Sequence, residues 1–134
     1  EAGIKVVPLP GACAAITALC ASGIASDRFC FEGFLPVKKG RATRLAALSS
    51  ESRTLVFYES PHRLVKTLTQ FVETFGPERQ VAVCREISKV HEESVRGTLE
   101  EVLAHFTETE PRGEFVIVLA GCEEKESKKK NTNE

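Results

Sequence analysis

The heptapeptide FYESPHR at positions 57–63 sets polar and charged side chains directly after an apolar run. The β-branched and aromatic residues of 54–58 predict a strand, and Glu59 follows at its carboxyl end. In open α/β sheets ligands bind beyond the carboxyl ends of strands, so Glu59 is a candidate for a binding or proton-transfer site. Ser60 and Pro61 have a simpler interpretation, since both are favoured where a helix begins.

A second polar stretch, residues 85–97, also follows an apolar segment and holds charges of both signs. A salt-bridged turn and a substrate-facing loop both fit this pattern. We select Glu59 and Glu86 as candidate general bases, because both are expected at strand ends that face one cleft. His62 and Lys89 are further candidates for that role.

Two other stretches can contact a ligand. Residues 38–44 hold four basic side chains and no acid, which fits a solvated helix face or a phosphate contact. The aromatic Phe34 before them is too isolated to indicate a base-stacking platform. At 8–15 a Pro-Gly turn leads into a helix of small residues, which lets a ligand approach free backbone N–H groups or lets the helix pack closely. This stretch is neither G-x-G-x-x-G nor a P-loop.

The elements that must position these stretches alternate along the chain. Strands are expected at 4–9, 29–34, 54–58, 80–86, 93–96 and 114–120, and helices at 12–21, 39–48, 63–75 and 98–105. Thr98 and Glu101 fit a capping box. The pattern predicts the α/β class, with a mixed five- to six-stranded sheet flanked by helices. The short gap between 80–86 and 93–96 excludes a crossover helix and predicts an antiparallel pair.

Composition narrows the class of protein further. The net charge of −1 over 134 residues argues against a protein that coats nucleic acid non-specifically. The five cysteines show no C-x-x-C spacing, so neither a metal site nor a disulfide framework is expected. Their apolar surroundings predict a reducing cytoplasm and small buried side chains at Cys13, Cys20, Cys30 and Cys84. No apolar run is long enough for a membrane helix, and 122–134 is expected to be disordered.

In this order, the chain contains the stretches PLPGACAAITALCASG, FEGFLPVKKGRATRL, RTLVFYESPHRL, CREISKVHEESVRGTL and RGEFVIVLAG. Together they resemble the C-terminal half of the bacterial ribosomal RNA small subunit methyltransferase I family, within the tetrapyrrole methylase superfamily. The resemblance covers about residues 4–121. It implies an S-adenosylmethionine (SAM)-dependent enzyme that methylates the ribose 2′-hydroxyl of a cytidine in small-subunit rRNA. Superfamily members are commonly homodimers, so the resemblance also implies a homodimer.

The same resemblance assigns parts to residues of this chain. It implies that 1–121 is the C-terminal domain of a two-domain protein whose N-terminal domain is absent here. The fragment alone is then expected to be inactive, with Glu59 facing open solvent. The implied cofactor contacts are Pro10, Cys13, Ala14, Tyr58, Glu59, Ile87, Glu114 and Phe115. The basic residues expected to contact rRNA are Lys38, Lys39, Arg41, Arg44, Arg63, Arg85, Lys89 and Arg96.

Two other functions stay open from the sequence. A superfamily member that methylates carbon in a tetrapyrrole, such as a precorrin or uroporphyrinogen, would share the fold. FYESPHR and the basic stretch at 38–44 count against it. A non-catalytic dimerisation or docking module would fit a chain that lacks half of its active site.

Overall fold

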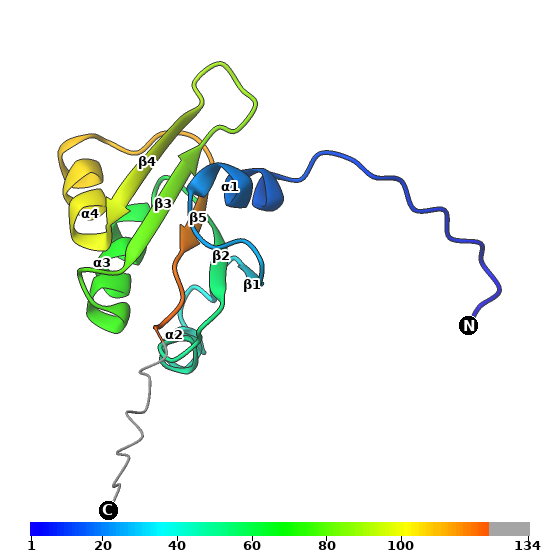
Figure 1. Cartoon of the computed structure of the whole chain (residues 1–134), viewed down its shortest axis with the longest axis horizontal. Helices are drawn as coiled ribbons and strands as arrows, with labels where there is room; N and C mark the ends of the chain where they lie inside the picture. Colours follow the sequence, from blue (N-terminus) through cyan, green and yellow to red (C-terminus); the bar gives the residue numbers. More distant parts are fainter. Residues whose placement is uncertain (124–134) are drawn as a thin grey trace, which may run out of the picture.

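The computed structural model describes residues 1–123, which form one mixed sheet with helices on both faces (Figure 1). In chain order the elements are α1 (Ala14–Ser22), β1 (Phe29–Gly33), α2 (Arg41–Leu48), β2 (Thr54–Glu59), α3 (Leu64–Phe75), β3 (Gln80–Arg85), β4 (Glu93–Thr98), α4 (Leu99–Glu108) and β5 (Phe115–Leu119). The predicted α/β class is confirmed, with five strands in the sheet.

The strand order is β1-β2-β5-β3-β4. β1 pairs parallel to β2, and every other neighbouring pair is antiparallel, including the predicted pair β3–β4. The register aligns Glu59 with Phe115, Phe115 with Arg85, and Arg85 with Glu93. The carboxyl ends of β1, β2 and β3 therefore lie at the same end of the sheet as the starts of β4 and β5. We call this the pocket end.

Two hydrophobic clusters hold the sheet between its helices. The larger one joins a sheet face to α3 and α4, and α3 contributes Leu64, Leu68, Phe71 and Phe75 at helical spacing. The smaller one joins the other face to Ala15, Ala18 and Leu19 of α1. Each fully buried large side chain stabilises the fold by about 1.5–3 kcal/mol. The larger cluster therefore fixes β2, β3 and β5, the three strands that carry the pocket end.

The two predicted helix starts have different outcomes. α4 begins as expected, because the Glu101 N–H donates to Thr98 Oγ1 over 3.2 Å. The prediction that Ser60 caps α3 is wrong. The helix begins at Leu64, and the Ser60 carbonyl instead accepts a 3.2 Å bond from the Arg63 N–H in a turn. That turn keeps residues 60–63 out of the helix and beside the end of β2.

The strand expected at 4–9 is also absent. Residues 1–13 have no regular structure and extend away from the sheet (Figure 1). Their apolar side chains are largely exposed, with 82% for Val6 and 86% for Leu9. A strand requires a neighbour for its backbone groups, and no described residue pairs with this segment.

The cysteine prediction was right in only one position. Cys84 is buried, Cys30 is half-buried, and Cys13 and Cys20 are exposed because the buried face of α1 is formed by other residues. Burial raises the pKa of the Cys30 thiol. All five cysteines are free thiols.

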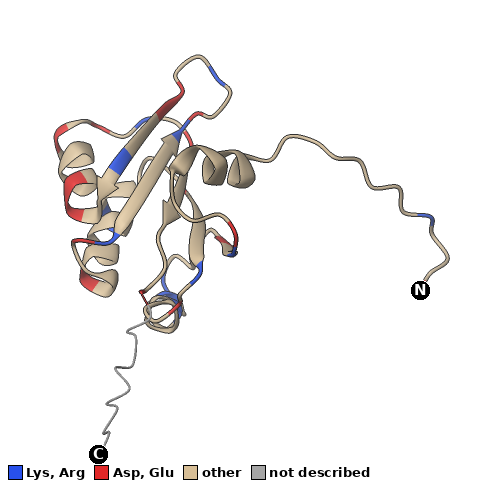
Figure 2. Ribbon diagram, viewed as in Figure 1, with Lys and Arg blue, Asp and Glu red and all other residues tan. Residues whose placement is uncertain are grey.

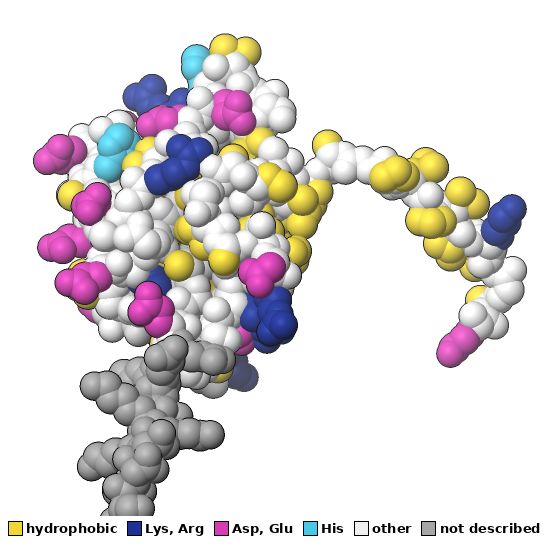
Figure 3. Space-filling model, viewed as in Figure 1, with side chains coloured by type: hydrophobic (Ala, Val, Ile, Leu, Met, Phe, Trp, Pro, Cys, Tyr) yellow, Lys and Arg dark blue, Asp and Glu magenta, His cyan; other side chains and the backbone are white. Residues whose placement is uncertain are grey.

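Acidic side chains gather on the outer sides of α3 and α4, whereas hydrophobic atoms gather over α1 (Figures 2 and 3). Within residues 1–123, no helix has the length and apolarity needed to cross a membrane. The same part of the chain holds no group of three metal-ligating side chains. The disorder predicted for 122–134 concerns residues outside the described part, apart from Cys122 and Glu123. The Cys122 N–H donates to the Glu51 carbonyl over 2.7 Å, which ties it to the body of the domain.

Candidate functional site

A pocket of about 600 Å³ lies at the pocket end of the sheet. Five segments that are far apart in sequence contribute to it: the start of α1, the residue after β1, the end of β2, the turn after β3, and the start of β5. The lining residues are Ala14, Phe34, Tyr58, Glu59, Ser60, Pro61, Glu86, Ile87, Lys89, Glu114, Phe115 and Val116. The volume is within the range of small-molecule and cofactor sites.

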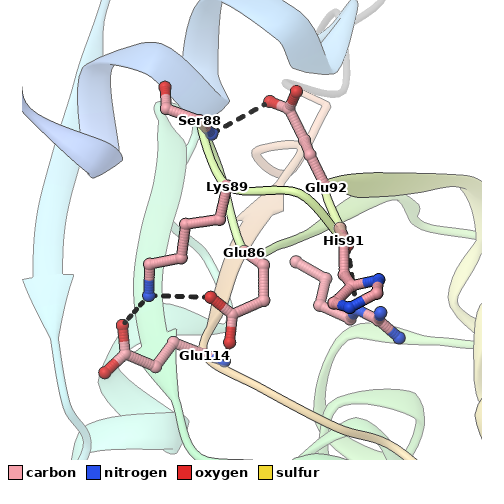
Figure 4. A network of polar contacts seen from close by, with 7 residues as sticks. Glu86, Ser88, Lys89, His91, Glu92 and Glu114 are labelled. Carbon is pink, nitrogen blue, oxygen red and sulfur yellow. Dashed lines mark hydrogen bonds and ion pairs between the residues drawn. The ribbon is translucent and has the colours of Figure 1, made fainter.

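One wall of the pocket is an ion-pair network of three residues (Figure 4). Lys89 Nζ lies 2.7 Å from Glu86 Oε2 and 3.2 Å from Glu114 Oε2. Glu86 Oε1 also accepts the Glu114 backbone N–H over 3.2 Å. The Lys89 hydrogen bond holds the pKa of Glu86 below its ordinary value, and Glu86 in turn raises the pKa of Lys89. Glu86 and Lys89 are therefore both charged at neutral pH.

The backbone around this network is unusual. Glu86 and Ser88 have φ of 49° and 63°, a region that L-residues other than glycine rarely adopt. Such conformations persist where surrounding contacts fix them, and they are frequent at functional sites. Gly113 has φ of 88°, and a Cβ at that position would overlap the Glu86 carboxylate. Gly113 is thus required for the close approach of the β5 start to Glu86.

The opposite side of the pocket contains Glu59, which is only 5% exposed. Its Oε1 accepts the Ser60 N–H over 2.8 Å, and its Oε2 accepts the Thr67 hydroxyl over 2.7 Å. Arg41 then donates to Thr67 Oγ1 over 2.8 Å and to Gln70 Oε1 over 2.7 Å. The expectation that Glu59 faces open solvent is therefore wrong, because the turn after β2 and the buried Thr67 of α3 supply partners for its carboxylate.

The pocket combines apolar walls with an excess of negative charge. Tyr58, Ile87 and Phe115 supply apolar surface, while three carboxylates accompany the single Lys89 ammonium. The start of α1 adds backbone N–H groups that have no acceptor within the helix. This mixture suits an amphipathic ligand that carries both a cation and an anionic group.

The structure brings together most of the residues implied as cofactor contacts. Ala14, Tyr58, Glu59, Ile87, Glu114 and Phe115 all line the pocket. The remaining two, Pro10 and Cys13, are exposed and do not line it. Cys13 is the N-cap residue of α1, adjacent to Ala14, and Pro10 belongs to the irregular N-terminal segment. Of the suggested general bases, Glu59, Glu86 and Lys89 line the pocket and His62 does not.

The basic residues do not form one surface. Lys38 and Lys39 are exposed between β1 and α2, and Arg44 pairs with Glu32 over 3.1 Å. Arg85 lies with Lys89 in a second cavity of about 850 Å³ beside the first.

Of the other basic residues, Arg96 and Arg41 donate side-chain hydrogen bonds within the fold. Arg96 donates two hydrogen bonds to the Ala21 carbonyl, over 2.6 and 3.1 Å. Arg63 is the half-buried N-cap residue of α3. Arg41 is 5% exposed, and its guanidinium donates to Thr67, Gln70 and the Pro36 carbonyl. The placement of Arg41 is a correction, since a buried guanidinium with these partners is not presented to an external phosphate.

Sequence reasoning missed an aromatic cluster at the pocket mouth. The ring centroids of Phe31 and Phe34 lie 5.2 and 5.7 Å from that of Tyr58, both in edge-on geometry. The alternation of Phe29 and Phe31 was a visible signal for one exposed face of β1. The contribution of Phe34 depends on a register irregularity between Phe31 and Gly33, which no sequence pattern indicated.

The fold and the pocket together define the class of protein. The sequence profile of the tetrapyrrole (corrin/porphyrin) methylases matches residues 1–103, and the chain belongs to this family. Among solved structures, the methyltransferase CobJ superposes with a TM-score of 0.66 at 20% identity, over 90% of this chain and 53% of that protein. A uroporphyrin-III C-methyltransferase from Thermus thermophilus, complexed with S-adenosyl homocysteine, gives 0.59 at 22% identity, over 88% and 53%. These likenesses establish the fold.

Particular relatives are much more similar in sequence. Ribosomal RNA small subunit methyltransferase I of Synechocystis sp. is 51% identical over 123 residues, 91% of this chain. The protein of the same name from Pasteurella multocida is 54% identical over 124 residues, 90% of this chain. The chain spans 44% of the length of either relative.

Proposed function

We propose that this chain is the C-terminal domain of a SAM-dependent methyltransferase that methylates the ribose 2′-hydroxyl of a cytidine in small-subunit rRNA. The observation that carries the proposal is the identity of 51–54% to relatives named ribosomal RNA small subunit methyltransferase I. The pocket supports it, because six of the eight implied cofactor contacts converge there.

The pocket fits SAM by its chemistry. When bound, SAM supplies a methyl group on a positively charged sulfonium. Glu59, Glu86 and Glu114 complement that positive charge, and Tyr58, Ile87 and Phe115 supply apolar surface for the rest of the molecule. Glu86 keeps its charge at neutral pH because Lys89 lowers its pKa. Glu86 is accordingly better suited to supply a fixed negative charge than to act as a general base.

The chain's own residues then have separate tasks. Methyl transfer requires the donor, the methyl carbon and the acceptor oxygen in line, which is mainly a matter of positioning. The ion-pair network of Glu86, Lys89 and Glu114 fixes one wall, and the buried Arg41–Thr67–Glu59 chain fixes the other. Glu59 is the better placed of the two carboxylates to accept the hydroxyl proton, since its hydrogen bonds come from an N–H and a hydroxyl and not from an ammonium.

The proposal extends to partners and location. The substrate is small-subunit rRNA or the assembled subunit, approached from the side that carries Lys38 and Lys39. The enzyme is a cytoplasmic homodimer, in which an N-terminal domain completes the pocket. Because that domain supplies the rest of the active site, the chain alone is inactive.

Transfer of a labelled methyl group from SAM to small ribosomal subunits tests the proposal. We compare this chain alone with a chimera in which the N-terminal part of the Synechocystis relative precedes it. The chain alone is expected to show no turnover, and the chimera is expected to label rRNA at a cytidine ribose. Turnover by the chain alone, or a chimera that methylates a precorrin instead of rRNA, contradicts the proposal.

The roles of the two carboxylates separate in the same chimera. Glu59→Gln is expected to lower kcat, because the amide cannot accept the hydroxyl proton. Glu86→Gln is expected mainly to raise KM for SAM, because it removes fixed charge. If both variants keep the full rate, neither residue takes part. Glu73→Gln on the outer side of α3 is the control and should leave both constants unchanged.

A further inference from the structure

The aromatic cluster of Phe31, Phe34 and Tyr58 lies at the mouth of the pocket, and we call it the aromatic platform. Tyr58 is its centre, since both phenylalanine rings meet it edge-on at 5.2 and 5.7 Å. Phe34 and Tyr58 also line the pocket itself. The platform is therefore continuous with the site where methyl transfer is proposed.

The phenylalanine rings of the platform are much more exposed to solvent than the phenylalanine rings of the core. Phe34 is 66% exposed and Phe31 is 55% exposed, whereas Phe57 and Phe71 of the core are almost completely buried. An exposed group of large apolar side chains beside a pocket marks a binding surface. The backbone is arranged to produce this exposure. Gly33 has φ of 61°, and at this position the pairing of β1 with β2 shifts register. This bend directs the chain so that Phe34 reaches Tyr58.

Positive charge follows the platform directly. Lys38 and Lys39 are exposed, and no acidic residue lies between them and Phe34. The four residue steps from Phe34 to Lys38 span at most about 14 Å between Cα atoms. This distance is comparable to the length of one or two nucleotides of RNA. Lys38 and Lys39 thus make the surface beside the platform positive, whereas carboxylates outnumber ammonium groups inside the pocket. A ligand that places an aromatic ring on Phe34 and anionic groups on Lys38 and Lys39 matches both features.

We propose that Phe34 is a stacking site for a base of single-stranded RNA, with Lys38 and Lys39 holding the adjoining phosphates. This inference rests on the proposed function and adds the residue that positions the substrate nucleotide. Bases stack on aromatic side chains without regard to sequence, and lysines follow the backbone. A base held on Phe34 leaves its ribose facing the pocket that Phe34 and Tyr58 share.

A second copy of the chain is the rival occupant of this surface. A two-fold interface centred on Phe34 would contact itself, so Lys38 and Lys39 of one copy would approach the same residues of the other. Like charges set against each other across an interface are unfavourable. The two lysines beside the platform therefore favour a polyanion over a self-contact.

The test measures binding of the full chain to a short, fluorescently labelled, cytidine-rich single-stranded RNA by anisotropy. Phe34→Ala is expected to weaken binding about 5- to 150-fold, the value of one base stack. Phe34→Trp is expected to bind as tightly as the original chain, because it keeps an aromatic face. Val37→Ala is the matched control from the same loop, 60% exposed and not aromatic, and should stay within about two-fold.

The lysines have a separate readout. Lys38→Gln combined with Lys39→Gln should reduce the slope of log affinity against log salt by about 0.7 for each phosphate that the lysines no longer neutralise. Sedimentation velocity of every variant measures self-association at the same time.

Each outcome decides between the proposals. If the original chain binds RNA and Phe34→Ala binds equally well, the stacking site is refuted while the proposed rRNA substrate stands. If the original chain does not bind RNA at all, this inference is overturned, whereas the proposed rRNA substrate is decided separately by methyl transfer in the chimera. If Phe34→Ala changes self-association and not RNA affinity, the platform is an interface between copies, which also overturns the inference.

Discussion

Replacing Thr67 by valine tests whether the buried polar chain behind the pocket holds the domain together. The Thr67 hydroxyl accepts from Arg41 over 2.8 Å and donates to Glu59 over 2.7 Å, and Thr67 is 1% exposed. Valine keeps the branched shape and replaces the hydroxyl with a methyl group that makes no hydrogen bond. Each hydrogen bond to a charged group contributes about 1.5–3 kcal/mol. Both ions keep other partners, so we take the lower value for each bond and expect a loss of about 3 kcal/mol.

The assay is urea unfolding of the chain followed by far-UV circular dichroism, with the slope and midpoint fitted together. Thr69→Val is the matched control, since it removes a hydroxyl from an exposed position of the same helix and should cost less than about 0.5 kcal/mol. Thr67→Ser should recover most of the loss, because it restores the hydroxyl. A stability of Thr67→Val within about 0.5 kcal/mol of the original chain refutes the reasoning.

Three further predictions concern charge and backbone. Lys89→Met should raise the pKa of Glu86, because the ammonium that lowers it is gone; an unchanged NMR titration of Glu86, with Lys66→Met as the control, contradicts this. Gly113→Ala should also raise the pKa of Glu86, since a Cβ displaces the carboxylate, and should destabilise the chain by about 1–2 kcal/mol, since the alanine is held at φ of 88°. Gly11→Ala is the control, because the space around Gly11 is open. Equal effects of the two changes refute the argument. Arg53 holds the pKa of Glu51 at about 2. The stability due to this lowered pKa is present above the ordinary carboxyl pKa and is lost as pH falls through the folded value. Arg53→Gln should therefore be less stable than the original chain at neutral pH, and the gap should close as pH falls from about 4.5 toward about 2; a gap that does not change over this window is the contrary result.

Most helices and strands could be predicted from the sequence, because in the sheet and in α3 the residues that form the hydrophobic pattern are the residues that are buried. Leu64, Leu68, Phe71 and Phe75 are spaced for one helix face, and that face is the one that packs. The strand expected at 4–9 failed for a physical reason. Local propensity describes one chain segment, whereas a strand depends on a neighbour that this chain does not supply among its described residues.

The location of the pocket could be predicted from the sequence, but the contacts of its side chains could not. Polar residues after strands indicated the pocket end, and Glu59 and Glu86 both lie there. What could not be predicted was the set of partners. Arg41 looked like part of a basic surface, yet it is buried against α3, because only the tertiary packing of α2 on α3 decides which way that side chain points.

The position of Tyr58 also gives the protein a built-in optical and magnetic reporter. The chain contains one tyrosine and no tryptophan, and this tyrosine stands in the pocket wall between Phe31 and Phe34. Its emission and its ring-proton resonances therefore come from a single place, which is the place where ligand is expected. Any molecule that enters the pocket or covers the platform alters these signals without a label being attached. Binding can thus be followed on the unmodified chain before any activity is reconstituted.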